Sequence, residues 1–126
     1  MNDNIDIKDQ DNSIRIITSK ISLPELKKIA EERFGDLVKA VVDVDRRIMA
    51  IGGELHADEE AQLLEDGSRQ EHLWGINLYP DKTIPDMIEF DSMINIRPSQ
   101  GNRSRAITDE HIRSAIVAIV KGLVAE

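Results

Sequence analysis

The chain of 126 residues has no cysteine, no long apolar run and few aromatic residues. The absence of cysteine excludes disulfides, thiolate zinc sites and cysteine nucleophiles. No apolar run approaches the ~18 residues that span a bilayer. The N-terminus is acidic and polar, whereas a secretory signal begins with basic residues and continues with an apolar stretch. We therefore expect a soluble, cytoplasmic protein that does not bind membranes.

Basic residues are also in short supply, since 16 lysines and arginines stand against 24 acidic residues, for a formal net charge of −8. An acidic surface repels the phosphate backbone of nucleic acids. The four aromatic residues offer little area for stacking bases. These features argue against nucleic-acid binding. Hydrophobic residues make up 40% and charged residues 32% of the chain, which is typical of one globular domain with a sizeable core.

The charge is distributed unevenly along the chain. Residues 1–13 hold four aspartates and little apolar surface, so we expect a disordered acidic tail before a single domain over residues 14–126. Residues 54–71 contain seven acidic residues and one basic residue, a net charge of −6. Residues 97–105 contain three arginines and no acidic residue. This basic segment within an acidic protein is the most informative feature of the sequence.

Apolar periodicity predicts about five strands. Alternating or β-branched apolar residues mark them, and a tight turn at residues 45–47 predicts a hairpin. The last strand region is either two strands or one strand with a bulge. The predicted strands cover residues 14–18, 38–44, 48–51, 73–79, 87–90 and 93–96.

Capping residues and apolar spacing predict three helices. Ser22 fits an N-cap, with Glu25 as its capping-box partner. Thr108 fits the N-cap of the last helix. Between them, a short helix begins after Gly53, and its expected buried stripe consists of Ala57, Ala61 and Leu64. Helices and hairpins mix without strict alternation, so we predict an α+β fold with a mixed or antiparallel sheet.

The arginine segment carries the chemistry for binding phosphate or carboxylate. Guanidinium groups donate forked, charge-assisted hydrogen bonds to such anions. Serine, glutamine and asparagine side chains among the arginines add further hydrogen-bonding groups. The alternative is that the arginines pair with the protein's own surplus of acidic residues. The predicted ligand-binding residues are Arg97, Ser99, Gln100, Asn102, Arg103, Ser104 and Arg105.

A second candidate site follows Gly52 and Gly53, where a strand ends and a helix begins. His56 with either Glu54 or Asp91 could form a general acid/base pair, and these three residues are the candidate catalytic groups. A metal site is a second alternative, since His56 and Glu60 are four residues apart, but it needs three or four ligands and Asp91 or Glu89 would have to complete it. The alternative is that His56 packs near the helix start while the acidic residues are solvated.

Three stretches are similar to an uncharacterised family of short bacterial and archaeal proteins, a domain of unknown function. They are residues 53–58 (GELHAD), 73–80 (LWGINLYP) and 88–104 (IEFDSMINIRPSQGNRS). The resemblance runs from about Ile14 to the C-terminus, and the acidic tail looks like an addition to the family's usual start. It implies no reaction, because no activity is associated with the family.

Two classes of function remain open at this point. The leading hypothesis is an enzyme acting on a small anionic, for example phosphorylated, metabolite. The arginines would bind the anion, and His56 with its carboxylate would move a proton or hold a metal. The alternative is a non-catalytic module that binds an anionic ligand or another protein. In the latter case the arginine segment would dock an acidic partner and the acidic helix a basic one. No cofactor is identified, and a homo-oligomer is compatible with the sequence.

Overall fold

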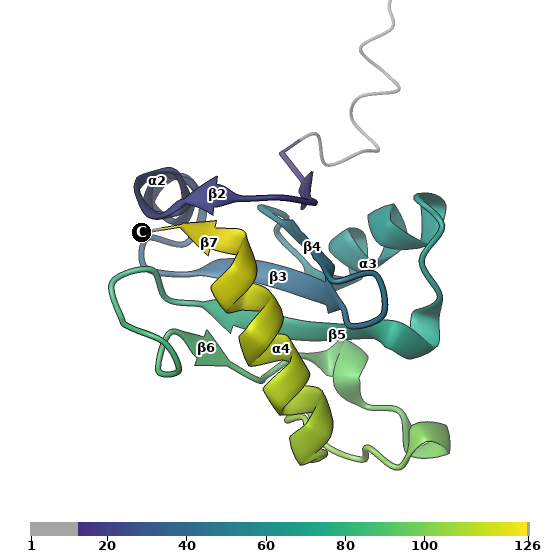
Figure 1. The fold of residues 1–126 in the computed structure, drawn as a ribbon. Coiled ribbons are helices and arrows are strands. Elements are labelled where there is room, and N and C mark those ends of the chain that lie inside the picture. The colour runs from purple at the N-terminus through teal and green to yellow at the C-terminus, as the bar shows by residue number, and fades with distance from the viewer. Residues whose placement is uncertain (1–12, 126) are drawn as a thin grey trace, which may run out of the picture.

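The computed structural model describes residues 13–125, so the predicted acidic tail, apart from Ser13, lies outside the described residues. The fold is α+β, as predicted, and its main sheet is antiparallel throughout (Figure 1). The strand order is β1–β4–β3–β5–β6. These strands are β1 (Arg15–Ile17), β3 (Val38–Asp43), β4 (Ile48–Ile51), β5 (Leu73–Leu78) and β6 (Ile88–Glu89).

Three α-helices and a small second sheet complete the described part of the chain. The helices are α2 (Leu23–Arg33), α3 (His56–Glu65) and α4 (Glu110–Leu123). Two very short strands, β2 (Ile21–Ser22) and β7 (Val124–Ala125), pair in parallel. Three 3₁₀ helices occur as well, η1 (Gln70–His72), η2 (Met93–Asn95) and η3 (Pro98–Gln100). No helix within residues 13–125 is long and apolar enough to cross a membrane.

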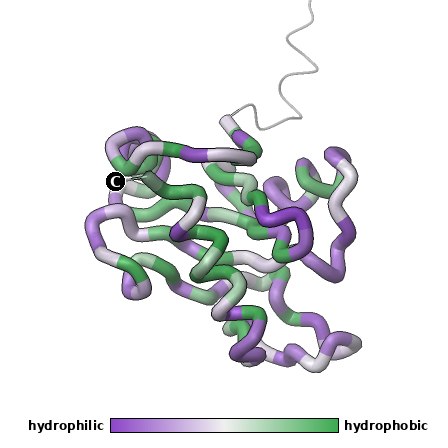
Figure 2. Tube along the Cα trace, viewed as in Figure 1, coloured by the Kyte–Doolittle hydropathy of each residue, from purple (hydrophilic) through white to green (hydrophobic). Residues whose placement is uncertain are grey.

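The sheet separates two hydrophobic clusters, because alternate side chains of a strand point to opposite faces. Ala40 and Val42 of β3 pack on one side with residues of α2 and α4. Val41, between them, packs on the other side with Leu63 of α3. Figure 1 shows α4 crossing one face of the sheet while α3 lies on the other. In Figure 2 the strands are mostly hydrophobic, whereas the turn between β3 and β4 is hydrophilic.

Local sequence signals explain two of the elements directly. The predicted hairpin is confirmed by the antiparallel pairing of β3 with β4. Asp43 stabilises its turn by accepting hydrogen bonds from the backbone N–H groups of Asp45 and Arg46, each at 2.9 Å. Ser22 is the N-cap of α2, as predicted, and its hydroxyl accepts a hydrogen bond from the backbone N–H of Glu25 at 3.2 Å.

The predicted N-cap of the last helix is wrong by one residue. Asp109 caps α4, and its carboxylate accepts hydrogen bonds from the backbone N–H groups of His111 and Ile112. The backbone N–H and the hydroxyl of Thr108 both donate to Asn102 Oδ1 at 3.0 Å. Thr108 therefore bonds to Asn102, six residues earlier, instead of capping α4, and the local sequence does not reveal this contact.

The predicted buried stripe of α3 is also wrong, because Ala57, Ala61 and Leu64 are exposed. The helix buries His56, Glu59 and Leu63 instead. Both polar members of this face have backbone partners. Glu59 Oε2 accepts a hydrogen bond from Gly53 N at 2.9 Å, and His56 Nε2 lies 2.8 Å from Ile76 O. Polar groups with such partners can be buried, so the face of α3 that contains His56, Glu59 and Leu63 lies against the sheet.

The predicted strand at residues 93–96 is a 3₁₀ helix, η2, and the strand at 87–90 shortens to β6. The hydroxyl of Ser92 caps η2 by accepting a hydrogen bond from Ile94 N. The side chain of Asn95 then occupies the edge of β5 that a further strand would have used. A side-chain amide thus takes the place of a strand at this edge of β5, and the candidate site lies here.

Candidate functional site

The segment from Ser92 to Ala106 is fastened to the edge of β5 beyond the point where β6 ends. Asn95 Oδ1 accepts a hydrogen bond from Gly75 N at 2.8 Å, and Asn95 Nδ2 donates to Gly75 O at 2.9 Å. Asn95 is fully buried. A side chain on Gly75 would collide with Ser92, because a Cβ there would lie 2.5 Å from Ser92 Cβ. The absence of a side chain at Gly75 therefore lets the loop lie directly against the strand.

Asn102 holds the second half of the same loop. Its Nδ2 donates to the backbone oxygens of Asn95 at 2.7 Å and Ala106 at 2.8 Å. Its Oδ1 accepts the two hydrogen bonds from Thr108 described above. The predicted ligand-binding residue Asn102 is thus buried and engaged within the loop. Ser104, another predicted ligand-binding residue, donates from its hydroxyl to Ala106 O at 3.2 Å.

Arg97 and Gln100 fasten the loop to η1. The Arg97 guanidinium donates to the backbone oxygens of Gln70 and Leu73 and lies over the ring of Trp74, 4.1 Å from its centroid. Gln100 Nε2 donates to the backbone oxygen of Glu71 at 3.0 Å. Burial lowers the pKa of Arg97, while the negative charge of Glu60 acts in the opposite direction. Both side chains therefore have partners inside the protein.

The two remaining arginines of the segment are exposed and differ in their partners. Arg105 pairs with Asp91, with Nε 2.7 Å from Oδ1 and Nη2 3.4 Å from Oδ2. The Arg103 side chain makes no hydrogen bond or ion pair with any residue of the described range 13–125. The predicted residue Ser99 lies in η3 and is exposed. Arg103 is thus the arginine in this loop whose side chain has neither a hydrogen-bond partner nor an ion pair within the described range.

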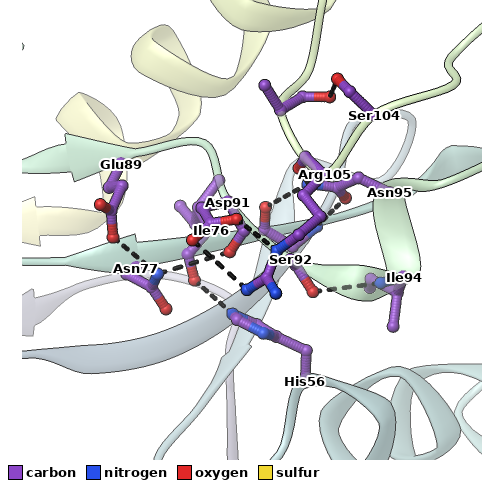
Figure 3. A network of polar contacts seen from close by, with 12 residues as sticks. His56, Ile76, Asn77, Glu89, Asp91, Ser92, Ile94, Asn95, Ser104 and Arg105 are labelled. Carbon is purple, nitrogen blue, oxygen red and sulfur yellow. Dashed lines mark hydrogen bonds and ion pairs between the residues drawn. The ribbon is translucent and has the colours of Figure 1, made fainter.

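His56 is buried at the start of α3, with its ring against β5 (Figure 3). Ile76 O can only accept, so Nε2 of His56 carries the proton in their 2.8 Å hydrogen bond. Burial lowers the pKa of His56, while the bond to Ile76 raises it. Among nearby charges, Lys39 lowers this pKa and Asp91 raises it. The pKa of His56 lies below its ordinary value, so the ring is neutral at pH 7.

Asp91 connects His56 to the arginine loop. It interacts electrostatically with His56 and forms the ion pair with Arg105. In Figure 3, Asp91, Arg105 and His56 appear in one network with Asn77. Asp91 therefore lies beside the arginine loop.

Glu54, the third candidate catalytic residue, is directed elsewhere. One of its carboxylate oxygens lies 3.3 Å from Arg33 of α2, and its side chain is largely exposed. His56, two residues later, points to β5 instead. The structure therefore brings His56 and Asp91 within electrostatic reach of each other and turns Glu54 towards another helix. Among residues 13–125, no group of three or more histidine, aspartate or glutamate side chains could hold a metal ion.

Sequence reasoning missed a small polar network beside His56. Asn77 Nδ2 donates to Glu89 Oε1 at 2.8 Å, and the Tyr79 hydroxyl donates to the same oxygen at 3.1 Å. Burial, followed by the bond to Glu89, raises the pKa of Tyr79. Asn77 is buried and its Oδ1 has no hydrogen-bond partner in the described structure. The signal that could have identified Asn77 was a lone amide in the apolar stretch 73–79.

Comparisons with known proteins identify one family. A family model described as "protein of unknown function (DUF5674)" matches residues 15–123. No curated protein matches the chain, and no solved structure matches it.

Proposed function

Because the chain belongs to the DUF5674 family of proteins of unknown function, we propose a function from the geometry of its arginine loop. The protein binds a small anion bearing a phosphate or carboxylate group, with Arg103 and Arg105 as the binding residues. Binding without catalysis is the function that the arrangement supports best.

The observation that carries this proposal is the contrast between Arg103 and its neighbours. Before Arg103 the loop is held by Arg97, Gln100 and Asn102, whose side chains donate to backbone oxygens. After Arg103 it is held by the bond from Asn102 Nδ2 to Ala106 O. Arg103 projects from this fixed loop with no partner in the described range. A charged group held on a preorganised segment loses little freedom on binding. Forked, charge-assisted bonds to an oxyanion are correspondingly favourable there.

Arg105 can contribute to the same ligand. Its Nε and Nη2 are used by Asp91, while its Nη1 makes no hydrogen bond with the part of the chain that the structure describes. Asp91 also sets the orientation of the guanidinium. The negative charge of Asp91 weakens the attraction of the loop for an anion, so we expect modest affinity.

Catalysis is the second candidate, and the electrostatic contact between His56 and Asp91 favours it. A neutral imidazole beside a carboxylate is a common arrangement for proton transfer. Against this candidate, Nε2 of His56 is occupied by Ile76 O, and Asp91 is held in its ion pair with Arg105. Two of the groups needed for proton transfer are therefore engaged with the protein itself.

A titration with inorganic phosphate, followed by thermal unfolding, tests the proposal. Wild-type protein should be stabilised by about 2.7 kcal/mol at a hundredfold excess over the dissociation constant. Arg103→Ala should lose this gain while remaining as stable as the wild type in phosphate-free buffer. Arg47→Ala is the matched control, because Arg47 is an exposed arginine in the turn between β3 and β4.

Two results would contradict anion binding at this loop. One is a wild-type protein that phosphate does not stabilise. The other is an equal gain in the Arg103→Ala and Arg47→Ala variants, which would indicate a general salt effect. Hydrolysis of a phosphate or carboxylate ester that depends on His56 would support the catalytic candidate instead.

A further inference from the structure

Exposed apolar side chains gather on one face of the molecule, formed by α3 and η2. Among residues 13–125, five large hydrophobic residues are exposed, and three of them belong to α3 or to η2 and its C-cap: Leu64, 40% exposed, Met93, 65% exposed, and Ile96, 39% exposed. Helix α3 and η2 are in contact. We propose that this surface, which we call the α3–η2 face, is a dimer interface that binds the same face of a second copy of the chain. It consists of Ala57, Ala61, Leu64, Met93 and Ile96.

The spacing in α3 places its apolar residues on one stripe. Ala57, Ala61 and Leu64 are separated by four and three residues, and such positions are neighbours on a helix surface. Glu60 lies in the same stripe, three residues after Ala57 and four before Leu64. Its electrostatic interaction with Arg97 shows that this side of α3 is turned towards the segment that follows η2. The exposed stripe and the exposed residues of η2 therefore form one surface.

This exposure is not explained by the packing of α3 within the monomer. The helix lies against the sheet through His56, Glu59 and Leu63, which leaves its alanine and leucine stripe facing outwards. An amphipathic helix normally buries its apolar stripe and exposes its charges. Contiguous exposed apolar surface of this kind marks interaction sites on soluble proteins.

The charges around the face identify the partner as a second copy. On the acidic side, Asp58 and Glu65 of α3 are exposed and make no ion pair with other residues of the range 13–125. On the other side lies the arginine loop, where Arg103 is also unpaired within that range. Most other charged side chains of these two segments are engaged within the monomer, namely Glu54, Glu59, Asp66, Glu71, Arg97 and Arg105. The negative charges of Asp58 and Glu65 and the positive charge of Arg103 therefore remain for a partner.

Two-fold symmetry makes such a face complementary to itself. In an isologous interface both copies use the same surface, so a contact from segment i of one copy to segment j of the other is repeated from j to i. The acidic helix of each copy would face the arginine loop of its partner, and the apolar stripes would meet at the centre. These contacts between opposite charges also offset part of the repulsion expected between two chains that each carry −8.

The dimer goes beyond anion binding and depends on different residues. Leu64 and Met93 play no part in the proposed anion site, so changing them tests the dimer alone. Arg103 belongs to both, and phosphate should therefore weaken the dimer by competing with the partner's carboxylates.

Sedimentation of the wild-type protein over a range of concentrations gives the first test. We expect a monomer–dimer equilibrium, and the double variant Leu64→Glu with Met93→Glu should weaken it at least tenfold, or about 1.4 kcal/mol. Phe34→Glu is the matched control, because Phe34 is exposed to a similar degree, 42%, but lies at the end of α2. It should leave the equilibrium unchanged. A wild-type protein that stays monomeric up to about 1 mM, or an equal effect of Phe34→Glu, would overturn the proposal.

Charge reversal gives a second test that leaves the apolar residues intact. Arg103→Glu alone should weaken the dimer, and so should Asp58→Lys combined with Glu65→Lys. An equimolar mixture of these two proteins should dimerise more strongly than either protein alone, because both halves of the mixed interface then pair opposite charges. A mixture that associates no better than its components would rule out the isologous arrangement. Circular dichroism of each variant verifies that it is folded.

Discussion

Buried side-chain amides act as backbone substitutes in this protein. Asn95 offers one acceptor and one donor to Gly75, which is the pattern that a neighbouring strand would provide. Asn102 connects the backbone of the loop to the residues before α4. A buried backbone group without a partner costs about 1–3 kcal/mol. These two amides therefore give the arginine loop a defined shape, and a defined shape is what makes a surface arginine useful for binding.

His56 supplies a prediction at the same scale, because its pKa is lowered by burial. As the pH falls through the ordinary value of ~6.5, histidine in the unfolded chain takes up a proton before His56 does in the folded protein. Folding stability should therefore fall as the pH is lowered. The glutamine side chain introduced by His56→Gln can still donate to Ile76 O but does not titrate, so the variant should lose less stability.

Urea unfolding at about pH 7.5 and about pH 5.5, on either side of the ordinary histidine pKa, measures this difference. His111→Gln is the control, because His111 is exposed near the start of α4, and it should behave as the wild type. Equal losses in the wild type and in His56→Gln would show that His56 does not couple folding to pH.

At the scale of elements, α3 departs from the rule that an amphipathic helix buries its apolar stripe. The sequence predicts a helix here, and the structure contains one, but the expected buried stripe faces outwards. Hydrophobic spacing alone could not reveal this orientation, since it depends on backbone groups at Gly53 and Ile76 that only the folded chain brings to the helix. The same limit applies to η2, whose place beside β5 depends on Asn95.

The close approach of η2 to β5 makes Gly75→Ala a sharp test of that packing. The added methyl group would lie 2.5 Å from Ser92 Cβ, and such overpacking costs typically about 1–3 kcal/mol. Gly122→Ala is the matched control, because a Cβ placed on Gly122 in α4 would meet no described atom within 4 Å apart from the backbone of its own helix and its chain neighbours. It should stabilise the protein by about 0.5–1 kcal/mol through the higher helix propensity of alanine.

Thermal or urea unfolding of both glycine variants measures the change in the free energy of unfolding that each one causes. Combining Gly75→Ala with Ser92→Gly should recover part of the loss, since Ser92 is the first obstacle to the new methyl group. Gly75→Ala with wild-type stability would mean that the loop moves away from β5 at little cost.

At the scale of the whole molecule, β7 near the end of the chain belongs to the fold. Val124 is buried and pairs with Ile21, which joins the end of α4 to the start of α2. Deleting residues 124–126 should cost about 1.5–3 kcal/mol, the value of one buried valine, as measured by urea unfolding. Deleting residues 1–12 should change the melting temperature by only a few degrees, because their acidic and polar composition offers little apolar surface to bury. A large loss from the second deletion would indicate that this segment packs on the domain or on a partner subunit.

The sequence by itself determined the elements whose signals are local. The Ser22 cap, the β3–β4 hairpin and the apolar face of α4 all depend on residues a few positions apart. The same is true of the α+β class and of the family resemblance, which the match over residues 15–123 confirms. The hydrogen-bonding partners of the cap and of the hairpin lie close by in the chain, and the apolar residues of α4 recur at helical spacing, so these signals can be read directly.

Only the tertiary structure decided which polar side chains are bonded within the protein and which remain free to bind a ligand. Arg97, Arg103 and Arg105 have the same chemistry and lie within nine residues, yet one packs on Trp74, one pairs with Asp91 and one has no partner in the described range. Those partners lie on strands and loops 14 or more residues away. No local pattern encodes such a separation, because the distance is closed only when the sheet forms and the loop docks on its edge.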